Sequence, residues 1–159
     1  MFEMKFPPPP HPSPSRPAYT PPPGACDAHV HVFGPSDRFP YHPKRTYTPV
    51  DAPREKLRAL HGQLGIDRAV IVQANCHGTD NAATLDAIAK SKGQWRGVAC
   101  VDEEFTDKDF EALHEGGIRG IRFSFARHLS GPPDFDRVHR IAEKVQGLGW
   151  HLVVYIESQ

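Results

Sequence analysis

Short apolar runs alternate with amphipathic stretches from residue 25 onward, and this alternation predicts repeated strand and helix units. Five apolar runs predict strands over residues 28–33, 69–74, 95–101, 118–125 and 150–156. The stretches between them predict helices over residues 53–64, 80–91, 106–115 and 134–147. A glycine near the far end of each predicted helix supports these boundaries: Gly65, Gly93, Gly116 and Gly149.

The order βαβαβαβαβ, with strands rich in Val, Ile and Ala, predicts a parallel sheet that is covered on both faces. Thr79 and Thr106 stand where helix N-caps are expected, and Asp109 completes an approximate capping box with Thr106. Five parallel strands suit either an open doubly wound sheet or the first five of the eight strands in a (β/α)8 barrel. The chain length alone favours the open sheet.

Residues 1–24 have a different composition, because they hold ten of the 17 prolines. A segment that lacks so many amide donors cannot join a helix or a sheet, so we expect a Pro-rich, disordered leader followed by a domain over residues 25–159. A ligand for a proline-recognising domain is the alternative interpretation of this leader.

Charge and cysteine content narrow the function classes. The 19 basic and 19 acidic residues cancel, so the composition gives no support for binding to nucleic acid or to a membrane surface. No run approaches the roughly 20 apolar residues of a bilayer span, and no secretory signal precedes the domain, so we expect a soluble cytoplasmic protein. The three cysteines form no Cys-x-x-Cys pair, which favours free thiols over disulfides or a zinc knot.

The stretch CDAHVHVFGP at residues 26–35 carries the first chemical signal. Alternate residues of a strand share a face, so His29 and His31 should project from one side, near the carboxyl end where parallel α/β proteins place their active sites. Such a pair suits one metal ion or one substrate carbonyl. Because roughly 0.6 such pairs arise by chance in a chain with this histidine content, the context of strand end and Gly34-Pro35 breaker carries the prediction.

The stretch GIRGIRFSF carries the second signal, because it places Arg122 inside a strand, on the same face as Gly120 and Ser124. A guanidinium in such a strand needs an anion nearby. A protein carboxylate in a structural ion pair and a substrate carboxylate satisfy this need equally well.

Polar residues also end the second and fifth predicted strands, and we expect them to line a shared pocket with Arg122: Gln73, Asn75, His151, Tyr155 and Glu157. Other residues have simpler interpretations. His77 and Asp80 suit a turn and a helix cap, and Cys76 and Cys100 suit buried, inert thiols. Three histidines on helical patterns are expected at the surface: His61, His114 and His139. The sequence contains neither a Gly-rich phosphate loop nor a Gly-x-Ser-x-Gly elbow.

Several motifs together resemble the amidohydrolase-related family, over nearly the whole chain from about residue 17. They are PAYTPPPGACDAHVHVFGP, the YTP after Arg45, AVIVQANCHGTDN, GIRGIRFSF and WHLVVYIE. The resemblance is to a branch that opens carboxylated cyclic lactones such as 2-pyrone-4,6-dicarboxylate, in the bacterial breakdown of aromatic compounds. It implies a (β/α)8 barrel of which this chain holds about the first five strands.

The resemblance also implies roles for individual residues. His29 and His31 would polarise the lactone carbonyl, and Arg122 would hold a substrate carboxylate. Other residues would line the substrate pocket: Tyr47, Asn75, His128 and Tyr155. This branch works without an obligatory metal, whereas the wider superfamily uses the same His29 and His31 pattern to bind zinc or manganese. Two positions depart from the pattern, because Asn75 replaces an expected serine and His128 stands near an expected arginine.

The family takes its general base, an aspartate, from the loop after the eighth strand, which these 159 residues do not reach. We therefore expect a truncated chain that is weakly active or inactive, with unpaired edges on its first and fifth strands that promote self-association. Two alternatives stay open: a metal-dependent amidohydrolase or decarboxylase of the same superfamily, and a non-catalytic binding protein built on an open five-stranded sheet.

Overall fold

A computed structural model describes residues 5–126 and 134–156, and it contains one parallel sheet. The strands are β1 (Cys26–Val30), β2 (Arg68–Val72), β3 (Trp95–Ala99), β4 (Ile118–Ser124) and β5 (His151–Tyr155). The α-helices are α1 (Arg54–Leu64), α2 (Ala82–Ala89), α3 (Asp107–Glu115) and α4 (Phe135–Gln146), and a 3-10 helix, η1, covers Asn75–His77. The predicted succession of strands and helices is confirmed.

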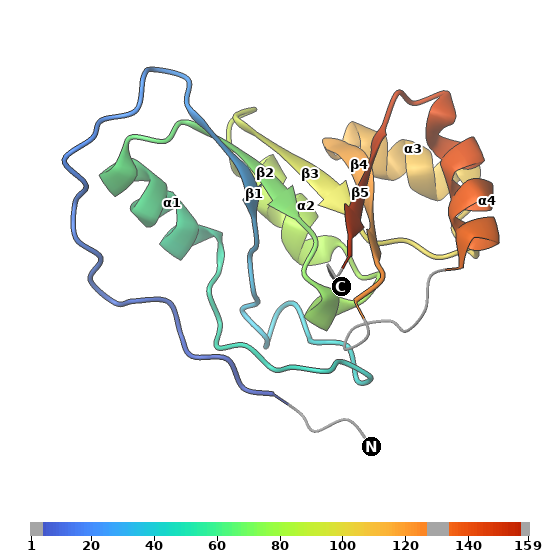
Figure 1. The fold of residues 1–159 in the computed structure, drawn as a ribbon, viewed down its shortest axis with the longest axis horizontal. Helices are drawn as coiled ribbons and strands as arrows, with labels where there is room; N and C mark the ends of the chain where they lie inside the picture. Colours follow the sequence, from blue (N-terminus) through green and yellow to red (C-terminus); the bar gives the residue numbers. More distant parts are fainter. Residues whose placement is uncertain (1–4, 127–133, 157–159) are drawn as a thin grey trace.

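The strand order answers the question of architecture. The strands lie side by side in the order β1-β2-β3-β4-β5, all parallel, without the reversal of order that defines a doubly wound sheet. Figure 1 shows that this sheet is curled and that each helix connects one strand to the next along its outer side. The five strands therefore form a curled half-barrel, as in a partial TIM barrel, and the open-sheet alternative is wrong.

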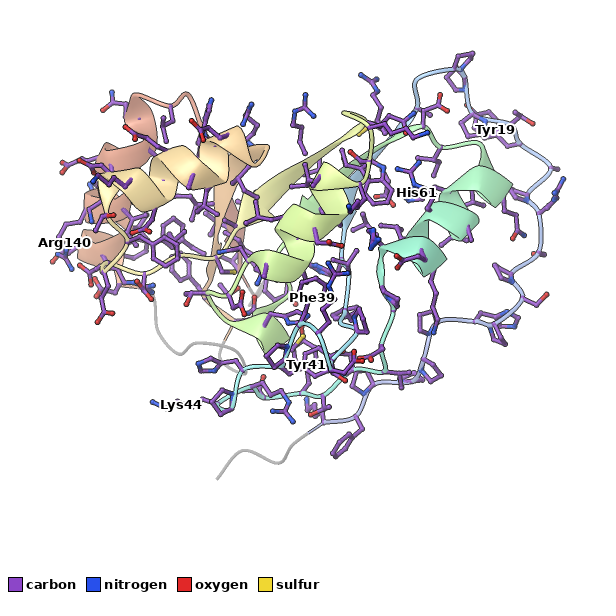
Figure 2. The ribbon with its side chains drawn as sticks, turned by 180° about the vertical axis from the view of Figure 1, so that it is seen from behind. Tyr19, Phe39, Tyr41, Lys44, His61 and Arg140 are labelled. Carbon is purple, nitrogen blue, oxygen red and sulfur yellow. The ribbon has the colours of Figure 1, made fainter. Side chains whose placement is uncertain are left out.

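The hydrophobic core lies between the sheet and its helices. Around β4, buried Ile121 and Phe123 pack with Phe110 of α3 and Ile141 of α4. Around β2, Ile71 packs with residues of α1 and α2: Leu57, Ala83 and Ala87. Figure 2, seen from behind, shows α2 and α3 covering this side of the sheet. Because Ile121 and Phe123 of β4 face the helices, Arg122 and Ser124 at the alternate positions of this strand point away from them.

The helix ends follow the sequence signals in part. Thr106 and Asp109 form the predicted capping box at the start of α3, and Gly65 ends α1 in the left-handed conformation with φ 75°. The predicted cap at Thr79 is wrong, because α2 begins later, at Ala82. Its N-cap is Asn81, whose side chain makes no capping hydrogen bond, and the Asp80 carboxylate accepts a hydrogen bond from the Ala82 amide at 3.0 Å.

The proline-rich segment contains no helix or strand between residues 5 and 24. It runs around the outer side of α1 before entering β1 (Figure 1). The Gln63 amide donates to the Pro14 carbonyl at 2.6 Å, and Lys5 exchanges backbone hydrogen bonds with Thr46 and Thr48. The Lys5 contact lies beside Tyr47 on the loop between β1 and α1. Among the described residues, none of the helices is long and apolar enough to cross a bilayer.

Candidate active site

The two histidines of the first motif lie together at the carboxyl end of β1. Their ring centroids are 5.2 Å apart, with the rings nearly perpendicular. His29 is exposed and His31 is half-buried, so the pair borders solvent rather than the helix-facing core. The expectation that both imidazoles project from one side of the strand is confirmed, whereas their chemical role stays a prediction.

A single hydrogen bond fixes the tautomer of His31. Its Nδ1 lies 2.7 Å from the Val72 carbonyl oxygen, and a carbonyl can only accept, so Nδ1 carries the proton. Burial lowers the pKa of His31, and the charge of Arg122 lowers it further, against the effect of the Val72 hydrogen bond. Neutral His31 therefore presents an unprotonated Nε2, which can accept a hydrogen bond or bind a metal ion.

Arg122 projects from β4 toward the same side. Its Nη1 donates to the Gln73 carbonyl at 3.3 Å, and its guanidinium carbon lies 5.5 Å from the centre of the Tyr155 ring. Its Nε is buried and has no hydrogen-bond partner. Within residues 5–126 and 134–156, no ion pair joins Arg122 to a carboxylate, so the structural ion pair allowed by the sequence does not form there.

The charge of Arg122 acts on the two imidazole groups of the first motif and on the phenol of Tyr47. After burial, this charge is the next cause that lowers the pKa of His29. Burial raises the pKa of Tyr47, and Arg122 opposes that rise. Electrostatic effects of this kind require proximity, so the Arg122 guanidinium on β4 lies close to β1 and to the loop that carries Tyr47. It also lies over the Tyr155 ring of β5.

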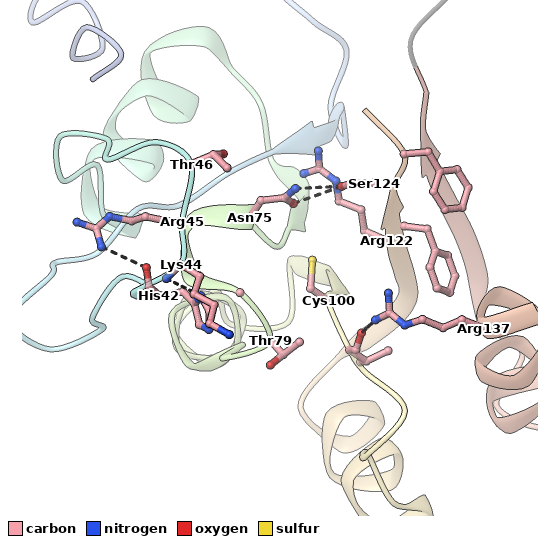
Figure 3. A pocket seen from close by; sticks show the side chains of 14 residues that line it. His42, Lys44, Arg45, Thr46, Asn75, Thr79, Cys100, Arg122, Ser124 and Arg137 are labelled. Carbon is pink, nitrogen blue, oxygen red and sulfur yellow. Dashed lines mark hydrogen bonds between the residues drawn. The ribbon is translucent and has the colours of Figure 1, made fainter. Parts of the chain in front are cut away.

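Asn75 and Ser124 form the next contact at the strand ends. The Asn75 amide donates to the Ser124 hydroxyl oxygen at 3.1 Å, which links η1 to the end of β4. Both side chains line a cavity of about 250 Å³ beside Arg122 (Figure 3). The cavity also receives side chains from the loop after β1 and from α4, among them Lys44, Arg45 and Arg137.

The cavity does not include every predicted site residue. Asn75 and Arg122 line it, whereas His29, His31, Tyr47 and Tyr155 do not. Those four residues surround Arg122 from the sides that face β1, β5 and the Tyr47 loop. His128 lies outside the described residues, as do Arg127 and Glu157.

Two predictions about polar residues are wrong. Gln73 does not share the pocket with Asn75, because it is fully buried on the α2 side, where Thr84 donates to its side-chain oxygen at 2.7 Å. His61 is not a surface residue: only 3% of it is exposed, and its Nε2 lies 3.1 Å from the Asp27 carboxylate (Figure 2). In both cases the polar side chain is buried because it forms a hydrogen bond to a residue of another element. The periodicity of a single element does not reveal such a partner.

His77 and the cysteines behave largely as predicted. His77 is buried, with Nδ1 3.3 Å from the Pro40 carbonyl oxygen, and its Nε2 accepts from the Gly34 amide at 3.3 Å. It therefore anchors the loop after β1 rather than facing a substrate. Burial raises the pKa of the Cys76 and Cys100 thiols to about 11, so both are protonated near neutral pH.

No pattern in the sequence pointed to the basic residues at the other side of the cavity. Lys44 and Arg45 lie in an irregular loop, and Arg137 lies in the first turn of α4, where a basic residue is ordinary. The part of the chain that the structure describes contains no group of three or more His, Cys, Asp or Glu side chains placed to hold a metal ion.

The comparisons with known proteins agree with this arrangement. A family model described as Amidohydrolase matches residues 26–157. The chain is 47% identical over 146 residues to 2-pyrone-4,6-dicarboxylate hydrolase of Comamonas testosteroni, covering 92% of this chain and 48% of that protein. It is 44% identical over 122 residues to 4-sulfomuconolactone hydrolase of Rhizobium radiobacter, covering 74% of this chain and 41% of that protein.

A solved structure from Acinetobacter baumannii, described as a probable 2-pyrone-4,6-dicarboxylic acid hydrolase with citric acid bound, superposes with a TM-score of 0.73. The two sequences are 25% identical, and the match covers 82% of this chain and 49% of that one. The chain thus spans about half the length of the relatives it matches.

Proposed function

The chain belongs to the amidohydrolase family, and on that premise we propose that its residues bind a carboxylated cyclic lactone and activate it for hydrolysis. The observation that carries this proposal is Arg122, a half-buried guanidinium with an unpartnered Nε, surrounded by imidazole and phenol groups. A planar guanidinium binds a carboxylate through two parallel charged hydrogen bonds. The names of the relatives point the same way, because they act on lactones that carry carboxylate or sulfonate groups.

Lactone hydrolysis requires water to add to the carbonyl carbon and the bond to the ring oxygen to break, which leaves a carboxylate and a hydroxyl group. A donor at the carbonyl oxygen stabilises the negative charge that develops there. We assign this donor to His29, because the Nδ1 proton of neutral His31 is already held by Val72. His31 can then accept a hydrogen bond from water at Nε2, and it donates to a carbonyl only when protonated.

Proton removal from water needs a base within hydrogen-bond reach, and the family resemblance assigns that role to an aspartate after the eighth strand of the barrel. The residues of this chain would therefore position the ring and polarise its carbonyl. Tyr47, Asn75, His128 and Tyr155 are proposed to border the bound ring, as the resemblance implies. A cytoplasmic location fits the free thiols of Cys26, Cys76 and Cys100.

The test is binding of 2-pyrone-4,6-dicarboxylate to the 159-residue chain, measured by isothermal titration calorimetry. Arg122→Gln should weaken binding on the order of 100-fold, because a charged, partly desolvated hydrogen-bond pair is lost. Arg119→Gln is the matched control, since this arginine lies on the same strand with its Nη1 bound to the carbonyls of Ile118 and His114. Equal affinities of the two variants would contradict the carboxylate role of Arg122.

Ring opening is followed in the same samples through the loss of the ultraviolet absorption of the pyrone. We expect a slow, enzyme-dependent loss that His29→Gln reduces on the order of 100-fold, as for other oxyanion donors. Equal rates of ring opening in the parent chain and in His29→Gln would contradict the donor role of His29 while leaving the carboxylate role of Arg122 intact.

A metal-dependent hydrolase or decarboxylase is the second candidate, and the tautomer of His31 is the observation that favours it. A proton on Nδ1 leaves Nε2 free, which is how metal-binding histidines are usually oriented. His29 and His31 would hold the ion, and a bound zinc or manganese ion would polarise the carbonyl and acidify its bound water. Metal analysis before and after treatment with EDTA distinguishes the two candidates, because only the metal-dependent one loses turnover with its metal.

A further inference from the structure

The cavity beside Arg122 has basic side chains on more than one side. Figure 3 shows Lys44 and Arg45 on the loop after β1 at one side of the cavity, with the Arg45 guanidinium pointing away from it, and Arg137 entering from α4 on the other side of the view. Arg122 stands between these two groups on β4. Five of the described lining residues are basic or imidazole side chains, and none of the described lining residues is acidic: the five are His42, Lys44, Arg45, Arg122 and Arg137.

These cations differ in how far the protein already satisfies them. Arg45 donates its Nε to the Thr48 hydroxyl at 2.8 Å and its Nη1 to the His42 carbonyl at 3.1 Å. Among the described residues, the Arg137 guanidinium donates only through Nη2, to the Val101 carbonyl at 3.1 Å. Across the described part of the chain, neither Lys44 nor Arg137 forms an ion pair with a carboxylate.

Cys100 lies within the electrostatic reach of both Arg122 and Arg137. This thiol lines the cavity, and the charges of both arginines oppose the effect of burial on its pKa. A cavity wall that holds two guanidinium groups, with no carboxylate among its described lining residues, favours an anion at each. Each arginine has donors left over for such an anion, because Arg122 keeps an unpartnered Nε and Arg137 uses one nitrogen.

We propose that Arg137, assisted by the charge of Lys44 on the loop after β1, forms a second anion subsite, which holds the distal acidic group of a substrate whose first carboxylate binds Arg122. The inference rests on the proposed function, because it assumes that Arg122 holds the first carboxylate. The ligand class is a small ring with two oxyanion groups, either two carboxylates or a carboxylate and a sulfonate. A monoanion occupies the Arg122 side alone and gains nothing from Arg137.

Benzoate and isophthalate are suitable probes, because they share one ring and differ by one carboxylate. Their dissociation constants are measured by isothermal titration calorimetry on the 159-residue chain and its variants. We expect isophthalate to bind about tenfold more tightly than benzoate, the effect of one charged hydrogen bond at a partly exposed site. Arg137→Gln should remove most of this tenfold ratio and leave the affinity for benzoate unchanged.

Arg140→Gln is the matched control. It makes the same substitution three residues further along α4, at an exposed arginine that pairs with Glu103 outside the cavity. This variant should keep both affinities, and circular dichroism should show the same helix content for both variants. Lys44→Gln should lower the ratio less than Arg137→Gln, because Lys44 is exposed and its charge is screened.

The outcomes separate this inference from the proposed function. If Arg122→Gln weakens both probes while Arg137→Gln leaves their ratio unchanged, the second subsite is wrong and the proposed function stands. Equal affinities of benzoate and isophthalate for the unchanged chain would also overturn the second subsite. If neither probe binds, or if Arg122→Gln affects neither, both the inference and the proposed function are contradicted.

Discussion

Strands β4 and β5 are neighbours in register, yet their apolar sides have different environments. Ile121 pairs with Leu152 and Phe123 pairs with Val154 across the two strands. Ile121 and Phe123 are 0% and 5% exposed, whereas Leu152 and Val154 are 40% and 48% exposed. The alternation is the same in both strands, so the difference comes from the helices, since α3 and α4 cover β4 and leave β5 open among the described residues.

The opposite sides of the same two strands also differ. On β4 this side carries Gly120, Arg122 and Ser124, and their register partners on β5 are His151, Val153 and Tyr155. The helix-facing side of β4 is a closed apolar core, while its other side carries a charge without a carboxylate partner in the described chain. Stability and ligand binding are thus separated on the two faces of one strand, and each face can be altered alone.

The largest expected effect comes from truncating matched residues on the apolar side. Ile121→Ala should lower the free energy of unfolding by about 2 to 5 kcal/mol, because a fully buried side chain leaves a cavity. Leu152→Ala, at the paired position of β5, should cost less than about 1 kcal/mol, because much of that side chain is already in water. Urea denaturation followed by circular dichroism measures both, and equal costs would mean that β5 is covered in solution.

The next largest effect tests how closely β4 and β5 approach on the polar side. A Cβ at Gly120 would lie 2.8 Å from the His151 carbonyl oxygen, which is backbone and cannot move aside without separating the strands. Gly120→Ala should therefore destabilise the fold by about 1 to 3 kcal/mol. Gly147→Ala is the control, because nothing lies within 4 Å of its Cβ and its φ is −65°. That change should stabilise the chain by about 0.4 to 1 kcal/mol in thermal melts.

A smaller effect depends on pH and should come from His77, the buried histidine of η1. Burial lowers the pKa of His77 below its ordinary value of 6.5, and its Nε2 must stay unprotonated to accept from Gly34. Below about pH 6.5 the unfolded chain then binds more protons than the folded chain, so the free energy of unfolding falls as the pH drops from 7.5 to 5.

The control for this pH effect is a pair of variants, one at His77 in η1 and one at Ile121 in the helix-facing core. His77→Gln should lower stability at pH 7.5 but make its decline toward pH 5 shallower, since one depressed histidine is removed. Ile121→Val should lower stability by the same amount at every pH, because no titrating group is changed. A pH slope that changes in the valine variant and not in the glutamine variant would contradict this separation.

The smallest effect on stability concerns the open apolar side of β5, where we expect self-association. Val154→Lys should change the free energy of unfolding by no more than about 0.5 kcal/mol, because Val154 is largely exposed. It should nevertheless shift the chain toward the monomer in sedimentation equilibrium, since a charge opposes pairing of an exposed edge strand. Leu60→Lys on α1, at 37% exposure, should leave the association state unchanged. A monomer in both the parent and the Val154 variant would disprove self-association through β5.

The sequence alone determined the elements and the sides of the strands. Each strand and each α-helix could be predicted from local periodicity, because a two-residue or 3.6-residue repeat is set by neighbouring residues, whereas the short helix η1 was not predicted. The same alternation placed His29 with His31 and separated Arg122 from Ile121. The side of the strand on which His29, His31, Arg122 and Ile121 lie was thus predicted correctly.

Tertiary structure decided which of these sides meet. The succession of strands and helices suited two architectures, and the strand order showed that they form a half-barrel. In this fold Lys44 and Arg137 line the same cavity, although they are 93 positions apart in the sequence. The sequence predicted Gln73 in the pocket, but in the structure its side chain bonds to Thr84. It predicted His61 at the surface, but in the structure His61 is buried against Asp27. The physical reason is that hydrogen bonds and charges between elements depend on register, curvature and helix placement, which no local repeat encodes.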